Sequence, residues 1–153
     1  MAIALNMTVP LKQDAESQQK LQGLIAGFAD QVQPAIDRAL SGSEIVHFAR
    51  VLVIDNKYLQ VLTEFDGDPM QYTEFFRKEL TEVFKTIFSL VEGAPPWDEL
   101  NNPTAFFEFS HDLNLKALGK STAGDDRGWL FSAVGDTTVR EIKDALKQPA
   151  PTA

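Results

Sequence analysis

Cysteine is absent from the 153-residue chain, and histidine occurs only twice, as His47 and His111. Without thiols the protein can form no disulfide, iron–sulfur cluster or thiolate metal site, and it has no cysteine nucleophile. Two histidines without cysteine also argue against a tetrahedral zinc site. We therefore expect no metal and no cofactor, although haem ligation by a single histidine stays open. A cysteine-free chain fits a reducing compartment, which favours the cytoplasm.

Basic residues and long apolar runs are also scarce. The chain has 14 Lys and Arg against 22 Asp and Glu, which gives a formal net charge of −8. A field of that sign repels phosphates and so argues against nucleic acid or an anionic membrane surface as a partner. The longest apolar runs are of strand length, far below the roughly 20 residues that span a bilayer. No phosphate-binding loop, dinucleotide fingerprint or nucleophile elbow is present.

The length of the chain is typical of a single domain. A chain of this length buries about two thirds of its unfolded surface, which is enough for a core without disulfides or metals. Neither an internal repeat nor a low-complexity linker divides the sequence. We expect a single domain over residues 1–147 and a flexible tail, rich in Pro and Ala, over residues 148–153.

Hydrophobic periodicity and capping signals predict an alternating order of strands and helices. Period-two alternation predicts strands over residues 2–9, 46–54, 58–65 and 129–134. Helical spacing predicts helices over residues 14–40 (divided near residue 33 by Pro34), 69–92, 102–111 and 136–147. With the segment after residue 93 treated as an insertion, this is the β-α-β-β-α-β order of a ferredoxin-like α+β fold. It implies a four-stranded antiparallel sheet with helices on one face, and dimerisation is the usual way to cover the other face.

The hairpin over residues 46–65 carries charged side chains in otherwise apolar strands. His47, Arg50 and Glu64 need partners at half-buried positions, so any site should be sought there. A two-residue loop would place His47 opposite Glu64, and a three-residue loop would place Phe48 opposite Glu64. The longer loop sorts the side chains better, with His47 on a mostly apolar face and Arg50 diagonal to Glu64 on the other.

Each charged residue has a structural interpretation beside the functional one. Arg50 can bind a carboxylate or phosphate, but an ion pair with Glu64 at a dimer interface is the more common explanation of such a residue. His47 is a candidate base or ligand near neutral pH, although a histidine on an apolar face is more often a core residue. Asp66-Gly67-Asp68 looks like a fragment of a calcium loop, and its role in starting the next helix explains it fully.

The pattern His47-Phe48-Ala49-Arg50, followed by the hairpin, Phe65-Asp66-Gly67-Asp68 and Glu92-Gly93, resembles a group of small, largely uncharacterised bacterial proteins. These proteins resemble members of the ferredoxin-like, dimeric α+β barrel superfamily. The resemblance covers residues 3 to about 145 and is best marked over residues 46–93. It implies a homodimer whose sheets pack face to face. Members of the superfamily include cofactor-free monooxygenases, haem enzymes and ligand-binding proteins, so no single activity follows.

The sequence leaves three hypotheses for the function of the protein. The first is a homodimer that binds a small, largely apolar molecule between sheet and helices. In this hypothesis His47, Phe65, Phe76 and Phe84 line the pocket, and Arg50 and Glu64 form its polar anchor. The second is a cofactor-free oxygenase or isomerase with His47 as the base. The third is a structural or interaction dimer in which Arg50 and Glu64 only fix the interface.

Overall fold

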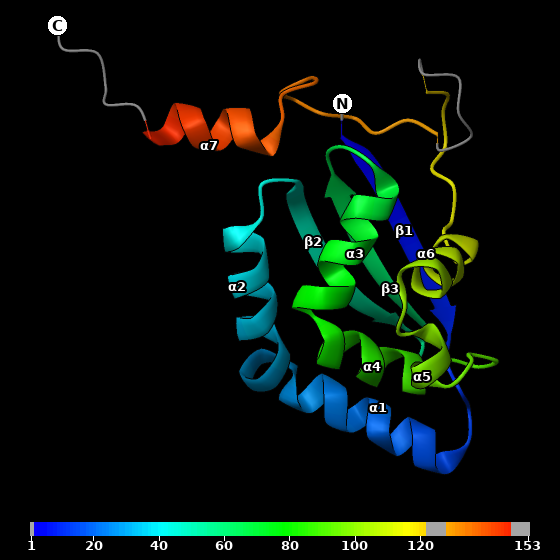
Figure 1. Ribbon diagram of the computed structural model, residues 1–153. Helices are drawn as coiled ribbons and strands as arrows, with labels where there is room; N and C mark the ends of the chain where they lie inside the picture. The colour runs from blue at the N-terminus through cyan, green and yellow to red at the C-terminus, as the bar shows by residue number, and fades with distance from the viewer. Residues whose placement is uncertain (1, 122–127, 148–153) are drawn as a thin grey trace, which may run out of the picture.

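The computed structural model describes residues 2–121 and 128–147. In chain order the elements are β1 (Ile3–Pro10), α1 (Ala15–Gly27), the π-helix η1 (Phe28–Val32), α2 (Gln33–Gly42), β2 (Val46–Ile54), β3 (Tyr58–Phe65), α3 (Pro69–Glu79), α4 (Thr81–Ser89), α5 (Trp97–Leu100), α6 (Pro103–Asp112) and α7 (Val139–Lys147). Figure 1 shows α7 apart from the other helices, near the end of the sheet at which β2 begins. The expected tail over residues 148–153 lies outside the described residues.

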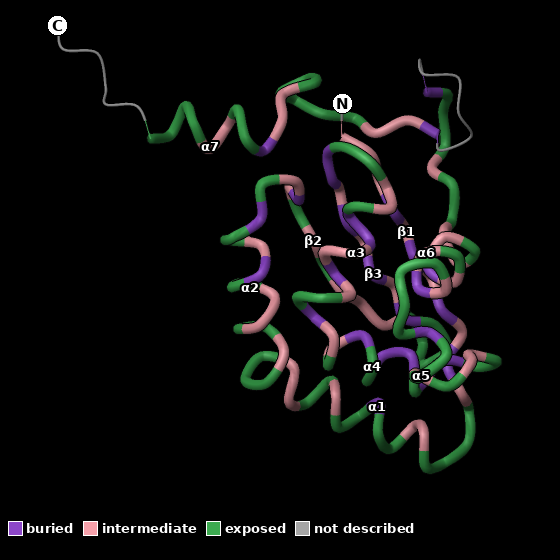
Figure 2. Tube along the Cα trace, in the orientation of Figure 1, coloured by how far each residue is buried: buried purple, intermediate pink, exposed green. Residues whose placement is uncertain are grey.

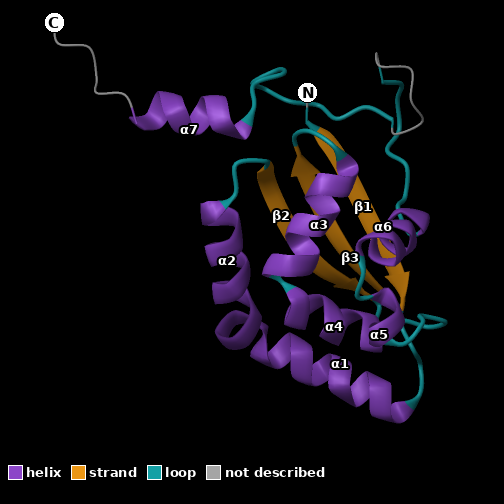
Figure 3. Ribbon diagram, in the orientation of Figure 1, coloured by secondary structure: helices purple, strands orange, loops and turns teal. Residues whose placement is uncertain are grey.

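The strands form one antiparallel sheet in the order β1-β3-β2. One face carries the alternating apolar side chains of β1 and β3 and is buried under helices, as Figure 3 shows. Burial is concentrated in these strands and in α3 and α4 (Figure 2). The period-two pattern that predicted the strands therefore also sets which face forms the core.

The prediction of a four-stranded ferredoxin-like sheet is wrong, because the residues that the structure describes form a sheet of only three strands. In the described part of residues 119–138 no strand forms, and the residues from 128 to 134 lie in irregular structure and a turn. The free side of β1 is occupied by other segments. Thr8 donates its main-chain N–H to the oxygen of Leu113, and Leu115 donates to the oxygen of Asn6. The edge that a fourth strand needs is thus largely used.

Further along, Val91 forms an isolated antiparallel bridge with Leu11, beyond the end of β1. The segment after α6 is held near residue 128 instead. Gly128 has a φ of 80°, and a Cβ added there would lie 2.0 Å from the oxygen of Ala117. Only glycine permits this approach of two backbones. The apolar run after Gly128 is therefore placed by a close contact and not by strand pairing.

The helix signals are mostly confirmed. Asp14 caps α1 by accepting the N–H of Ser17, and Asn102 caps α6 by accepting the N–H of Ala105. Pro34 lies in the first turn of α2, and the residues before α2 form the wider π-helix η1. The single helix expected over residues 69–92 is wrong, because it is divided at Leu80, whose φ of −127° and ψ of 37° lie outside the helical region. None of the helices in the described part of the chain combines the length and apolar character needed to cross a membrane.

Candidate functional site

The hairpin adopts the register of the three-residue loop. Ile54 pairs with Tyr58 and Phe48 with Glu64, as the better-sorted alternative predicts. Asp55 and Asn56 in the loop both have a φ of 54°, a left-handed conformation that Asn and Asp tolerate better than other residues with side chains. Phe48, Arg50 and Glu64 therefore lie on the outer face of the sheet, away from α3 and α6.

A bulge at the start of β2 changes the position of His47. The register shifts between Val46 and Phe48, so that the buried Val46 pairs with Phe65 and His47 is the additional residue. Strict alternation of side chains along β2 predicts His47 on the helix-covered face, but the bulge interrupts this alternation at His47. An extra residue bends the strand and re-aims its side chain. His47 instead lines a cavity together with outer-face residues.

His47 is held by Asp66, which directly follows β3. The imidazole Nε2 lies 2.8 Å from Asp66 Oδ1, and each of the two side chains is only 10% exposed. The second carboxylate oxygen, Oδ2, accepts the main-chain N–H of Val139 at 2.8 Å. The main-chain N–H of Asp66 donates to the oxygen of Ile45 at 2.7 Å. Asp66 thus joins the bulge, the end of β3 and the first turn of α7.

The contacts of Asp66 assign a tautomer to His47. An ionised carboxylate only accepts hydrogen bonds, so the Nε2 beside it carries the proton and donates it. The other ring nitrogen, Nδ1, then has a free lone pair, and it makes no hydrogen bond with the residues that the structure describes. In the Ser-His-Asp triad a carboxylate also orients the histidine base, but there it contacts Nδ1 and Nε2 acts as the base.

The cavity at His47 has a volume of about 200 Å³. It brings together His47, Arg50 and Glu64, the three charged residues that the sequence singled out. The remaining lining comes from Ala2, the exposed Phe48 and the segment after Gly128, namely Leu130, Phe131, Ser132, Val134 and Gly135. The run that was expected to form the fourth strand is therefore one wall of this cavity.

Arg50 and Glu64 do not form the ion pair that their diagonal positions suggested, since the close ion pairs of the described residues do not include them. Burial raises the pKa of the Glu64 carboxyl, and the nearby Arg50 and His47 side chains oppose this only in part. Arg50 is exposed, and its guanidinium has donors to spare for a ligand.

The aromatic residues proposed as pocket lining lie elsewhere. Phe65, Phe76 and Phe84 are buried on the helix-covered side, and the cavity that Phe76 and Phe84 line there measures about 10 Å³. Tyr72 stacks on Phe65 and makes an edge contact with Phe76. A space of that size holds at most about one water molecule. The structure thus brings the three charged candidates together and leaves the three aromatic ones in the core.

Asp66 is the residue that sequence reasoning missed, because a role at the start of α3 accounted for the turn. The signal that could have found Asp66 is its position in the sequence. It directly follows an apolar strand, and the end of that strand pairs beside His47. Within the described residues no group of three or more His, Asp and Glu could hold a metal ion. No protein-family model, curated protein or solved structure matches the chain. The chemistry of the site therefore rests on its own geometry.

Proposed function

We propose that the protein is a cytoplasmic homodimer that binds a small organic anion with an apolar body in the cavity at His47. The observation that carries the proposal is the convergence of His47, Arg50 and Glu64 on one cavity whose other walls are largely apolar. Arg50 supplies the charge and the planar fork for a carboxylate. Phe48, Leu130 and Phe131 supply apolar surface for the rest of the molecule. The site lies on the outer face of the hairpin instead of between sheet and helices.

Phenylacetate is a suitable probe, since it joins a carboxylate to one ring and suits a cavity of about 200 Å³. We expect isothermal titration calorimetry to detect binding, and Arg50→Met to weaken it roughly tenfold or more, because a hydrogen bond to a charged group contributes about 1.5–3 kcal/mol. Arg38→Met is the matched control, since Arg38 is exposed on α2 and does not line the cavity. Equal affinities of wild type and Arg50→Met would contradict the proposal, as would tighter binding of phenylacetamide.

The raised pKa of Glu64 gives this binding a pH dependence of known sign. Above the folded-state pKa the ionised Glu64 repels an anionic ligand, and below it the neutral carboxyl does not. Affinity for phenylacetate should therefore rise as the pH falls through that pKa, provided that the ligand itself stays ionised. Glu64→Gln should bind more tightly than wild type at pH 7 and lose this part of the dependence.

A second candidate function is acid–base catalysis with His47 as the base, without a cofactor. The specific observation in its favour is the contact of Asp66 with Nε2, which leaves Nδ1 as an acceptor. In an isomerase or a cofactor-free oxygenase, such a base removes a proton from a carbon atom of the bound acid. Binding and catalysis share the cavity, so the first proposal does not depend on the second.

The homodimer is proposed from the outer face of the sheet. Phe48 is 74% exposed there, and Ile54 and Tyr58 are exposed on the same face. Apolar side chains gathered on one face mark a surface for association. We expect light scattering after size-exclusion chromatography to give twice the mass of the 17.0 kDa chain, and Phe48→Glu to give the monomer. Leu146→Glu on α7 should stay dimeric. A monomeric wild type, or a dimeric Phe48→Glu, would rule out this interface.

A further inference from the structure

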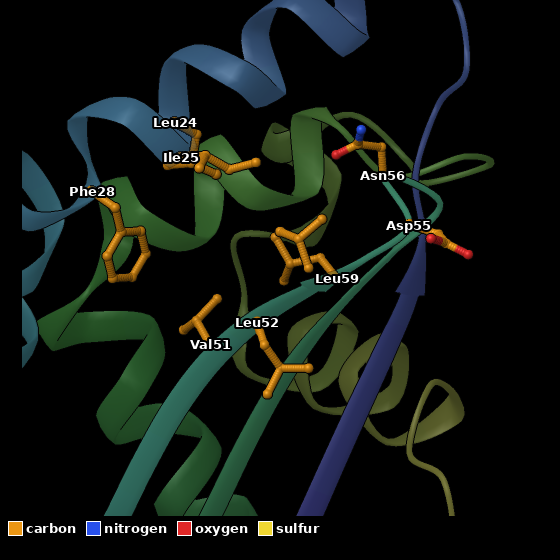
Figure 4. Close-up of a pocket in the computed structure, with 9 residues that line it drawn as sticks. Leu24, Ile25, Phe28, Val51, Leu52, Asp55, Asn56 and Leu59 are labelled. Carbon is orange, nitrogen blue, oxygen red and sulfur yellow. The ribbon is translucent and has the colours of Figure 1, made fainter.

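A second and larger cavity lies beside β2, on the other side of the hairpin from His47. Its volume is about 440 Å³. Figure 4 shows Leu24, Ile25 and Phe28 of α1 and η1 facing Val51 and Leu52 of β2, with Asp55 and Asn56 at one end. Ile25 is 44% exposed although it faces apolar neighbours. The helix and the strand thus form two apolar walls with space between them.

The strand wall of this cavity is an open sheet edge. Within the described part of the chain β2 pairs only with β3, so every second residue of β2 turns its N–H and C=O away from the sheet. From Phe48 to Val53, the main chain makes no hydrogen bond outside this ladder with the residues that the structure describes. Unpaired groups of this kind bind another extended chain. A cavity over such an edge offers main-chain hydrogen bonds and room for side chains together.

We propose that this cavity binds an extended peptide segment of a partner protein, which adds to β2 as a further strand. The main chain of the peptide pairs with the outer edge of β2 near Val51 and Val53. Its alternate apolar side chains fill the space under Leu24, Ile25 and Phe28. This site is separate from the cavity at His47 and does not rest on the function proposed there.

A second copy of the chain fits this edge less well than a peptide. Paired strands lie about 4.8 Å apart, whereas a helix with its side chains is about 10–12 Å wide. If two β2 edges paired antiparallel, both copies would bring α1 and η1 to the same side of the joint sheet. Those helices already reach over the edge, because they line the cavity there. A peptide carries no such helix and fits the space.

The charge at the cavity favours a basic residue in the peptide. Among the residues that the structure describes, no Lys or Arg lines the cavity, and the one ionisable group in its lining is the exposed carboxyl of Asp55. The formal charge of −8 adds to this preference. Asp55 follows the last residue of β2, so the first residues of a peptide that runs antiparallel to β2 lie beside it. We therefore expect a Lys or Arg at the start of the bound segment.

The test uses a hexapeptide, Lys-Val-Ser-Leu-Ser-Val, labelled with fluorescein at its C-terminus. Fluorescence anisotropy should show saturable binding to the full chain, and hydrogen exchange should show added protection in β2. Ile25→Ser should weaken binding roughly tenfold. Leu146→Ser is the matched control, since Leu146 is 80% exposed on α7, and it should bind as wild type does. A peptide N-methylated at alternate residues on the β2-facing side should not bind.

Asp55→Asn and replacement of the peptide's lysine by serine should each weaken binding by roughly threefold, and the two losses should not add when combined. Absence of binding up to about 1 mM peptide would overturn the proposal, as would equal binding of the N-methylated peptide or of Ile25→Ser. In Phe48→Glu, which removes the dimer interface proposed on the outer face, protection of β2 that rises with protein concentration alone would also overturn it, because a second copy would then occupy the edge. Excess phenylacetate should leave peptide binding unchanged.

Discussion

Replacing Phe65 by alanine is expected to lower the free energy of unfolding by about 3–5 kcal/mol, the range for truncating a fully buried aromatic side chain. Phe65 is 0% exposed at the end of β3. Its ring stacks on Tyr72 with centroids 3.9 Å apart, and Tyr72 in turn makes an edge contact with Phe76. The truncation removes the apolar contacts of the ring and leaves a cavity that the surrounding aromatic side chains cannot fill completely.

Phe48→Ala is the matched comparison, because it removes the same ring from the same hairpin at a 74% exposed position. Its free energy of unfolding should stay within about 0.5 kcal/mol of the wild-type value, measured by urea titration with both proteins diluted until they are monomeric. Similar losses in both variants would contradict the assignment of the core to one face only. A stable Phe65→Ala protein with a changed affinity for phenylacetate would instead return Phe65 to the ligand site.

The elements that could be predicted from the sequence depend on local physical rules. The register of the hairpin follows from the period of two, since only the three-residue loop puts Thr63 and Phe65 on the same face as Val51 and Val53. The caps at Asp14 and Asn102 follow from side chains that accept an N–H three residues ahead. Each of these features is decided within a few residues, and so the pattern alone is sufficient to find it.

The fourth strand failed because its existence depended on a competitor distant in the sequence. The run beginning at Trp129 has the composition of a strand, yet the partner edge on β1 is already bonded by Leu113 and Leu115. Nothing in the sequence of either segment indicates which of the two pairs with the free edge of β1. The break at Leu80 is similar, since the helical pattern continues across it without a proline or a glycine.

The site shows the same division. The unusual charges in the hairpin identified His47, Arg50 and Glu64, and these three do line one cavity. The bulge that aims His47 toward that cavity has no signal in a single sequence. Its partner Asp66 is recognised only once β3, the bulge and Val139 are placed together, because Val139 is 73 residues further along the chain.

Removal of that partner is expected to have the second large effect. In Asp66→Ala, His47 and the N–H of Val139 both lose a buried, charged acceptor. Since a hydrogen bond to a charged group contributes about 1.5–3 kcal/mol, we expect a loss of about 3 kcal/mol in the free energy of unfolding by urea titration. Asp68→Ala is the control, because Asp68 is exposed and its side chain makes no capping hydrogen bond.

Hydrogen exchange separates the two contacts of Asp66. The N–H of Val139 should exchange faster in Asp66→Ala, and protection across α7 should fall, because Asp66 anchors the first turn of that helix. Asp66→Asn keeps an acceptor for Val139 while its amide can donate to His47 Nε2, which would move the imidazole proton to Nδ1. If His47 is a base, Asp66→Asn loses turnover with α7 still protected. If His47 only contributes to ligand binding, the affinity of Asp66→Asn for phenylacetate differs from that of wild type, and there is no turnover to lose. Wild-type affinity together with wild-type turnover would show that Asp66 does not set the tautomer.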